Sequence, residues 1–467
     1  MQLTGTNRTF HPPRPVEAFL AAAERIEPAF TLPVLLLAAY LLALSSYTGQ
    51  MLISYLHLPI PVMGLTFGGA VLGFIISGRP GSFLSTPFAL PWTGLIMWWG
   101  LASVFGVYPG GSLTELWPYA YHIHILPLLF VAAAQTTRQV RVLMYAIACG
   151  YVLVIFYCFK FGTVVIDRFV IPNTSLGNSN DLAIHLLLGS AFMLIFLRRL
   201  RYTRFLWLVA TPALAWYVLK TGSRSNMLTM VLLAITCVLL SPRAYRFKLL
   251  AGLVAVSLMI VPLIPKTAWN RLTTFTAADV REGGSEADLL SASQAADSTA
   301  ARRELQRRGV LLTLRNPLLG VGPTMFSVGV DGMIREMTGH KSTWQNPHNT
   351  YLQVSSESGI PGLIFFLWTL VLCVRLNYRC YKQAIANPAL SPLALQSFCL
   401  LAGTLVYAFG ILFSHIAYDF QLSVLTGFSA ANYIAFQRAV RKLSPVVPPQ
   451  LATKAGRFGF VRTPAAS

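Results

Sequence analysis

The sequence NPHNTYLQVSSESGIPGLIFFLWTL, residues 346–370, joins a polar segment to a long apolar run. Asn346 is a good helix N-cap and Pro347 suits the first helical position, so His348 is expected in the first turn of a helix. That helix should end at Gly359, directly before an apolar membrane span. The stretch therefore predicts a membrane helix with a histidine at its polar mouth.

Apolar runs of this kind recur along most of the chain. Hydrophobic residues make up 55% of the sequence and charged residues only 11%, whereas soluble proteins carry about 25% charged residues. A bilayer core requires about 20 apolar residues per helix, and the runs supply about 12 such helices. The predicted fold is an all-α polytopic membrane protein. Its spans are expected to begin near Thr31, Ile60, Phe88, Trp117, Arg141, Asp181, Phe205, Ser225, Phe247, Pro361, Pro392 and Asp419.

These runs divide the chain into five parts. The polar, proline-rich start contains no short apolar region with a small-residue cleavage site, so no cleaved signal peptide is expected. The predicted parts are an N-terminal tail (1–28), spans one to nine (29–264), a long loop with short helices (265–358), spans ten to twelve (359–437) and a C-terminal tail (438–467).

The net charge of +20 invites a nucleic-acid partner, but the distribution of the charge argues against one. Basic residues gather in segments such as RRLRYTR (198–204) and RAYRFK (243–248), all on one side of the predicted membrane. Such a bias marks the cytoplasmic side. We therefore expect no nucleic-acid partner, and we expect both termini to be cytoplasmic.

Four cations break this rule because they lie beside short outer segments: Lys160, Arg168, Lys220 and Arg224. A cation in such a place is a functional candidate. Arg168 opens the segment DRFVIPNTSLGNSNDLA (167–183, from Asp167), and Arg224 lies in the turn KTGSRSNML (220–228). Guanidinium groups and exposed backbone N–H groups match phosphate oxygens. These segments predict an anionic, phosphate-bearing ligand at the outer surface, although lipid headgroups alone would satisfy them.

His348 is the candidate catalytic residue. The positive end of the helix dipole disfavours a protonated ring in a first helical turn. A neutral imidazole at neutral pH is what a general base requires. A histidine that merely bonds backbone or headgroups remains the alternative.

The long loop is expected to have two halves. Its first half, from Thr273 to Ala300, is polar and should be irregular. The following STAARRELQRRGVLLTL should be helical, capped by Ser298 or Thr299, with Leu305 and Leu312 on one face.

Other polar groups give weaker signals. No acidic cluster supports a metal ion, and the six cysteines lack metal-type spacing, so no metal, cofactor or disulfide framework is expected. His415 and Asp419, in the turn HIAYD, could relay a proton or bind a ligand, and the sequence leaves their role open. Glu357 lies about half a helical turn round from His348, so it is not an obvious partner for that ring.

Taken together, the motifs resemble the bacterial O-antigen ligase and polysaccharide polymerase superfamily. The most specific part is NPLLGVGPTMF followed by NPHNTYLQVSSESGIPGLIFFL, and GNSNDLA and GSRSN match the style of the family. The chain departs from the family at residues 177–180, where Gly-Asn-Ser-Asn replaces the more usual Gly-Asn-Pro-Asn.

The resemblance implies a GT-C-like, metal-independent, inverting glycosyltransferase in the bacterial inner membrane, with its site facing the periplasm and no cofactor. Its donor would be a glycan on undecaprenyl diphosphate. His348 would take the proton of the acceptor hydroxyl, and Arg168 and Arg224 would bind the diphosphate. Further candidate substrate-binding residues are Asn178, Asn180, Asn349, Tyr351, Arg302, Arg303 and Arg307.

Several functions remain open at this point. A ligase passes the glycan to lipid A core, which is the reading we favour, whereas an O-antigen or exopolysaccharide polymerase passes it to a glycan repeat. Transfer to a protein hydroxyl is a third variant. The non-enzyme alternative is a lipid or polysaccharide transporter, which would place charged or broken helices near the bilayer midplane. Sugar identity, linkage and oligomeric state are not encoded in these motifs.

Overall fold

The computed structural model describes residues 28–165, 168–198, 201–241, 243–260, 262, 286–341 and 346–443. The expected N-terminal tail lies almost wholly outside the described residues. The first part of the long loop (263–285) and the end of the C-terminal tail (444–467) also lie outside them.

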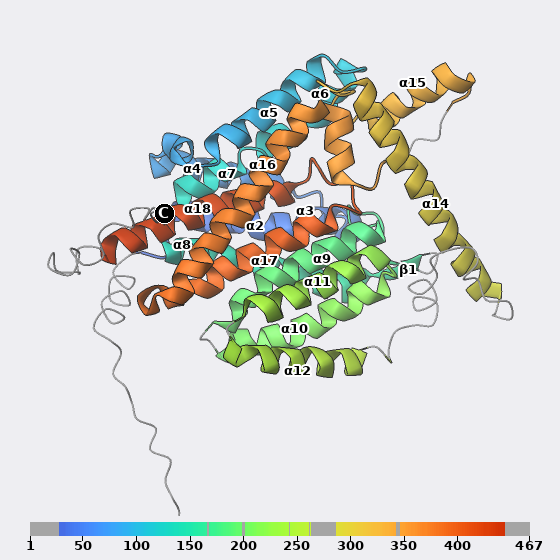
Figure 1. Cartoon of the computed structure of the whole chain (residues 1–467). Coiled ribbons are helices and arrows are strands. Elements are labelled where there is room, and N and C mark those ends of the chain that lie inside the picture. Colours follow the sequence, from blue (N-terminus) through green and yellow to red (C-terminus); the bar gives the residue numbers. More distant parts are fainter. Residues whose placement is uncertain are drawn as a thin grey trace, which may run out of the picture.

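The described chain is a helical bundle with one small hairpin (Figure 1). The elements up to the long loop are α2 (Leu32–Ser46), α3 (Thr48–Leu56), α4 (Val62–Ser77), η1 (Pro80–Ser85), α5 (Ala89–Val104), α6 (Pro109–His122), α7 (Leu126–Ala133), α8 (Thr137–Phe161), β1 (Thr163–Val165), β2 (Arg168–Val170), α9 (Ser179–Met193), η2 (Leu194–Leu197), α10 (Arg201–Lys220), α11 (Arg224–Leu240) and α12 (Arg243–Ile260). After it come α14 (Glu286–Arg315), α15 (Phe326–Thr338), α16 (Thr350–Ala386), η5 (Pro388–Leu393), α17 (Ala394–Gly410) and α18 (Phe420–Leu443).

Membrane spans were expected from about twelve apolar runs, and a helix begins close to most of the expected starts. Within the described residues, five helices are long and apolar enough to cross a membrane, or six if α2 and α3, bent by 52°, form one span. Helices α4, α5 and α11 have only 16 or 17 residues. The structure confirms an all-α membrane protein. The expected number of twelve spans is not confirmed by the length and composition of the described helices.

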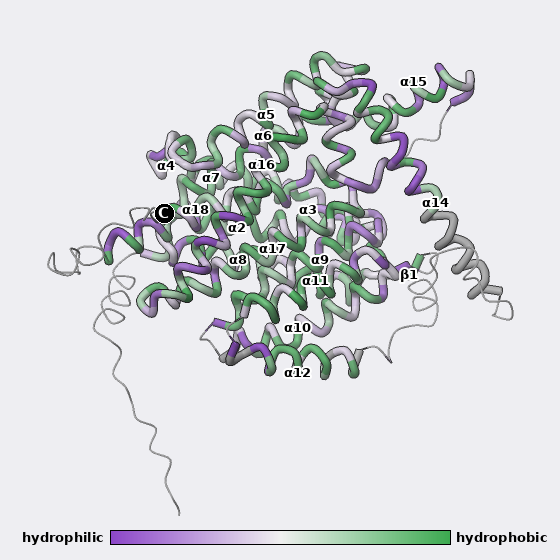
Figure 2. The backbone as a smooth tube through the Cα atoms, in the orientation of Figure 1, coloured by the Kyte–Doolittle hydropathy of each residue, from purple (hydrophilic) through white to green (hydrophobic). Residues whose placement is uncertain are grey.

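Helix α9 lies at the centre of the bundle. All its residues except Asp181 are buried, and it packs against α8, α10, α11 and α17. The first half of α18 is buried in the same core, against α7, α16 and α17. Apolar residues colour the body of the bundle, whereas hydrophilic residues gather at the ends of helices and on the described part of α14 (Figure 2). The polar residues of the outer motifs therefore lie where buried helices emerge.

The long loop differs from the expected pattern in its first half. Helix α14 begins at Glu286 rather than at a cap on Ser298 or Thr299, so the expectation of irregular structure up to Ala300 is wrong from Glu286 onward. The sequence EADLLSASQAA at its start is rich in Ala, Leu and Glu, which are strong helix formers. The expected apolar face is confirmed, because Leu305 and Leu312 are both buried.

These two leucines belong to a small core of their own. They pack with four residues from the turn after α14 and from α15, separately from the core of the bundle, namely Val321, Met325, Phe326 and Val330. Figure 1 shows α14 and α15 at one side of the bundle, with the C-terminal end of α18 at the opposite side. The described helices of the loop therefore form a small folded unit at one side of the bundle.

The segment that follows α14 is fixed to the start of α16 by backbone hydrogen bonds. Val321 N donates to Ser356 O and Gly322 N to Glu357 O, both at 2.9 Å, and Ile360 N donates to Pro317 O at 2.8 Å. A strand-like pairing of this kind needs the backbone of α16 to open. It opens at Gly359, where φ is 69° and ψ is −176°, so the expected interruption at this glycine is confirmed.

The buried carboxylate of Glu357 completes this junction. Its two oxygens accept hydrogen bonds of 3.1 Å from the backbone N–H groups of Thr324 and Phe326, at the start of α15. A carboxylate at a helix N-terminus satisfies donors that otherwise lack partners, and it opposes the helix dipole. Glu357 therefore joins the loop to the bundle, which explains its place in the motif without a role in chemistry.

Replacing Gly359 by Ala should lower the melting temperature of the detergent-purified protein. Its φ and ψ fall in a region that is essentially restricted to glycine, where strain costs about 1–3 kcal/mol, and a Cβ would overlap the carbonyl oxygen of Leu318. The matched control is Gly64→Ala in α4, where a Cβ meets nothing within 4 Å and Ala favours the helix. Equal melting temperatures for the two variants would contradict the assignment.

Candidate active site

His348 lies just before α16 rather than inside its first turn. The N-cap is Asn349, whose side chain accepts a hydrogen bond from Leu352 N at 3.1 Å, so the expected cap at Asn346 is wrong. The backbone of His348 takes a left-handed conformation, with φ of 48°. This turn directs the chain away from the helix axis one residue before the helix begins.

The segment between α17 and α18 explains why α16 starts at Thr350. Thr350 N donates to Ile411 O at 2.8 Å, and its hydroxyl donates to Ser414 O at 2.8 Å and accepts from Ile416 N at 3.1 Å. Gln353 accepts from Ala417 N at 3.3 Å. The first turn of α16 is thus bonded to residues 411–417. Capping rules consider only neighbouring residues, so they could not have predicted these bonds.

This docking brings a second histidine against His348. The rings of His348 and His415 meet edge to face, with centroids 4.9 Å apart and an interplanar angle of 82°. The Nδ1 atom of His415 is buried and has no hydrogen-bond partner among the described residues. The pair therefore contains one buried imidazole nitrogen without a hydrogen-bond partner among the described residues.

The electrostatic surroundings hold His348 neutral. Burial, the neighbouring His415 ring, and the charges of Arg302 and Arg168 lower the pKa of His348 to about 4. Burial also lowers the pKa of His415. A neutral ring at pH 7 was expected from the helix dipole, but the main cause is loss of hydration, followed by nearby positive charge.

Arg168 is positioned by the outer motifs. It lies at the start of β2, where it pairs with Val165 across the hairpin. Its Nη2 donates to Asn180 Oδ1 at 2.8 Å, and its Nε donates to Thr221 O at 3.5 Å. The guanidinium therefore lies between the start of α9 and the turn before α11.

The two outer motifs GNSND and GSRSN form one hydrogen-bond network around Asn180. Ser223 Oγ donates to Asn180 Oδ1 at 2.8 Å, and Asn226 Nδ2 donates to Asn180 O at 3.2 Å and to Ser223 Oγ at 2.9 Å. Asn178 caps α9 by accepting from Asn180 N at 2.9 Å. Asn178 and Asn180 therefore act in the structure as scaffold groups between α9 and α11.

Arg224 is the first residue of α11 and follows directly on the network residue Ser223. The turn before it has a glycine with positive φ, Gly222 at 62°. Arg224 is half-buried. Arg224 therefore follows the same buried turn whose Thr221 carbonyl accepts a hydrogen bond from Arg168. It also lies at a helix N-terminus, where backbone N–H groups favour anions.

The three loop arginines lie in different surroundings on α14. Arg302 is half-buried, and its charge reaches His348. Arg303 is exposed. Arg307 is 75% exposed and lies 3.7 Å from Glu304 in a surface ion pair. Only Arg302 is thereby connected to the candidate base.

Two other candidates are engaged within the protein. Asn349 caps α16, and the hydroxyl of Tyr351 donates to Ala408 O at 2.7 Å. The Asn349 bond closes the first turn of α16, and the Tyr351 bond fixes that turn against the end of α17. Both side chains stabilise the backbone next to His348, and their hydrogen bonds are made within the protein rather than offered to a substrate.

The sequence profile described as O-Antigen ligase matches residues 208–367. This segment of the chain is similar to the O-antigen ligase family. The match supports membership of the O-antigen ligase superfamily, and with it a ligase- or polymerase-type function at a membrane. No curated protein matches the chain.

The matched segment contains Arg224, Arg302 and His348, but Arg168 and Asn180 precede it and His415 follows it. In the structure Arg168 bonds to Asn180, His348 contacts His415, and the charges of Arg168 and Arg302 act on His348. Within the described residues, no three His, Cys, Asp or Glu side chains are grouped so that they could hold a metal ion.

His415 is the residue whose role sequence reasoning left open. The signal was the polar turn HIAYD between two apolar runs, but no local pattern connects it with a histidine 67 positions earlier in the sequence. Asp419, in the same turn, is half-buried, and its carboxyl group interacts electrostatically with Asp181 of the GNSND motif. The turn thus approaches both of the expected site segments.

The coupling between the two outer motifs can be measured by a double-mutant cycle. Asn180→Ala and Ser223→Ala should each lower the melting temperature, because each leaves a buried polar partner unsatisfied, at about 1–3 kcal/mol. The double variant should lose less than the sum of the two shifts, since both side chains serve one hydrogen bond. Additive shifts in thermal unfolding would contradict the network.

Proposed function

We propose that the segment similar to the O-antigen ligase family is the catalytic part of a membrane glycosyltransferase that moves a glycan from undecaprenyl diphosphate to an acceptor hydroxyl. The observation that carries the proposal is the half-buried, neutral His348, paired with His415 and subject to the charges of Arg168 and Arg302. A neutral base beside fixed cations suits a reaction that releases a diphosphate.

In the proposed reaction, the acceptor oxygen attacks the anomeric carbon of the donor sugar while the bond to the diphosphate oxygen breaks. The electron pair leaves with undecaprenyl diphosphate, and the proton of the acceptor hydroxyl passes to His348. A single displacement of this kind inverts the anomeric centre. It requires no metal ion if cationic side chains stabilise the departing charge.

Arg168 and Arg224 are the proposed diphosphate ligands. Arg168 bonds to Asn180, and Arg224 follows the network residue Ser223 at the N-terminus of α11, where the helix dipole favours an anion. Charge-assisted, forked contacts from arginine suit phosphate oxygens. Arg302 would approach from α14, above the donor, and Arg303 and Arg307 would contribute through long-range attraction only.

Diphosphate binding would also prepare the base. A pKa of about 4 makes His348 a weak base in the unliganded protein, and general bases work best when their pKa lies near the working pH. The negative charge of the donor would offset the cations that depress the pKa. The ring would become more basic only once the donor is bound.

The remaining parts of the proposal concern topology and acceptor. We propose that the nine apolar helical segments before the long loop and the three after it give twelve spans in a GT-C-like arrangement. The basic segments would face the cytoplasm, together with both termini, and the site would face the periplasm of the inner membrane. We favour a ligase with lipid A core as acceptor, and a polymerase with a glycan-repeat acceptor is the alternative.

His348→Ala should lower the transfer of glycan from an undecaprenyl-diphosphate donor by about 10²–10⁴-fold, the usual contribution of a general base. The assay uses reconstituted protein with the lipid-linked glycan and two rival acceptors, core lipid and free repeat unit. The product identifies ligase or polymerase.

His340→Ala is the matched control, because His340 is exposed at the end of α15 and should retain full activity. Transfer at the wild-type rate by the His348 variant would rule out the base. Transport of an unmodified lipid-linked glycan without any transfer product would instead favour the transporter.

The pH dependence should separate free from donor-bound protein. Only the neutral ring accepts a proton, so activity is lost as pH falls through the pKa of His348. The acidic limb of kcat/KM should lie near pH 4, and the limb of kcat, which reports the bound complex, should lie at higher pH. Arg302→Ala removes a nearby cation and should move the limb of kcat/KM upward. A wild-type limb at the ordinary histidine value would contradict the depressed pKa.

A further inference from the structure

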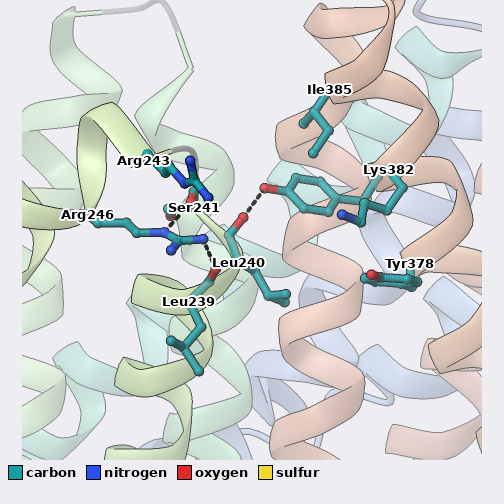
Figure 3. A pocket seen from close by; sticks show the side chains of 9 residues that line it. Leu239, Leu240, Ser241, Arg243, Arg246, Tyr378, Lys382 and Ile385 are labelled. Carbon is teal, nitrogen blue, oxygen red and sulfur yellow. Dashed lines mark hydrogen bonds between the residues drawn. The ribbon is translucent and has the colours of Figure 1, made fainter.

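A pocket lies at the opposite ends of α11 and α16 from His348 and Arg224. It has a volume of about 340 Å³, within the range of about 300–1,000 Å³ that small-molecule sites occupy. Figure 3 shows its lining, which comes from the turn between α11 and α12 and from the end of α16. The lining residues are Leu239, Leu240, Ser241, Arg243, Arg246, Tyr378, Tyr381, Lys382 and Ile385.

The polar part of this lining is cationic. Three of these nine described residues are basic and none is acidic. Arg246 is fixed in place, because its Nε donates to Ser241 O at 3.0 Å and its Nη2 to Leu239 O at 2.7 Å. Lys382 lies 5.8 Å from the centre of the Tyr378 ring, and Arg243 begins α12. The positive end of that helix therefore adds to the charge.

The pocket is braced by a contact between its two walls. The hydroxyl of Tyr381 on α16 donates to the carbonyl oxygen of Leu240, at the end of α11. This bond and the two made by Arg246 satisfy carbonyl groups at the C-terminal end of α11, where carbonyls otherwise lack partners. The walls are therefore fixed relative to each other in the structure, and a ligand would not need to order them.

Exposed apolar residues lead away from the pocket along both helices. On α11 they recur at helical spacing and end in the pocket, at Leu228, Val231, Ile235 and Leu239. On α16 they likewise reach it, at Ile364, Val371, Tyr378 and Ile385. In a membrane protein such faces contact acyl chains. Cations at one end of two apolar faces match the two parts of a phospholipid.

The pocket also lies at the depth that a headgroup would occupy. Helix α11 has 17 residues, which spans roughly 25 Å at 1.5 Å per residue, close to the thickness of a bilayer core of about 30 Å. Arg224 begins this helix and Leu240 ends it. The pocket therefore lies near the membrane surface opposite the candidate active site.

We propose that this pocket binds the phosphate headgroup of an anionic phospholipid, with the acyl chains along α11 and α16. Arg243 and Lys382 attract the phosphate, Arg246 presents its remaining guanidinium edge, and the lipid joins the α11–α12 turn to the end of α16. The site would stabilise the bundle in the membrane, and it does not depend on the glycosyl-transfer reaction.

The test measures binding of phosphatidylglycerol to the full-length protein by native mass spectrometry and by thermal shift in detergent. Phosphatidylcholine supplies the same acyl chains without net charge, and inorganic phosphate supplies the anion without chains. Phosphatidylglycerol should bind more tightly than either and should raise the melting temperature. The double variant Arg243→Gln/Lys382→Gln should weaken its binding on the order of 10–30-fold, from the loss of two surface cations.

Arg379→Gln is the matched control, because Arg379 is exposed on α16 but does not line the pocket. It should bind phosphatidylglycerol as the wild type does. Equal binding by the double variant, equal binding of phosphatidylcholine, or equal binding of inorganic phosphate would each overturn the proposal.

A second measurement does not depend on substitution. A phosphatidylglycerol with a photoactivatable acyl chain should label the wild-type protein on the segments 228–239 and 364–385. Labelling confined to other segments would also overturn the proposal.

Discussion

The position of His348 depends on how the first turn of α16 is held by the segment between α17 and α18. Thr350 uses its backbone N–H and its hydroxyl to bind this segment, and Gln353 binds it one turn later. Residues 411–417 in turn supply His415. One docking contact thus sets both the start of the helix and the neighbour of the candidate base. The half-buried, edge-to-face histidine pair is its consequence.

Two further sets of hydrogen bonds position the segments around that contact. The Asn180 network joins the starts of α9 and α11 and holds Arg168, and the Glu357 carboxylate joins the loop helices to the break in α16. Both use buried polar groups whose partners are supplied from distant segments. Removing one partner leaves the other unsatisfied, which is costly in a low-dielectric surrounding. Several of the most distinctive polar residues in the motifs are therefore engaged in building the site.

The two ends of the bundle have different chemistry. At one end, cations lie beside neutral imidazoles and a folded loop of 30- and 13-residue helices. At the other, cations line a pocket that continues into exposed apolar faces. The first arrangement suits a reacting phosphate-bearing group, and the second suits a resident lipid.

The sequence by itself determined the fold class, the approximate positions of the helices and the interruption at Gly359. These follow from short-range properties: apolar length, the lack of a Cβ, and local charge bias. The tertiary structure decided the N-cap at Asn349, the partnership of His348 with His415 and the linking role of Glu357. Each of these depends on hydrogen bonds or burial between segments far apart in the chain. Local patterns carry no information about which distant group supplies the partner.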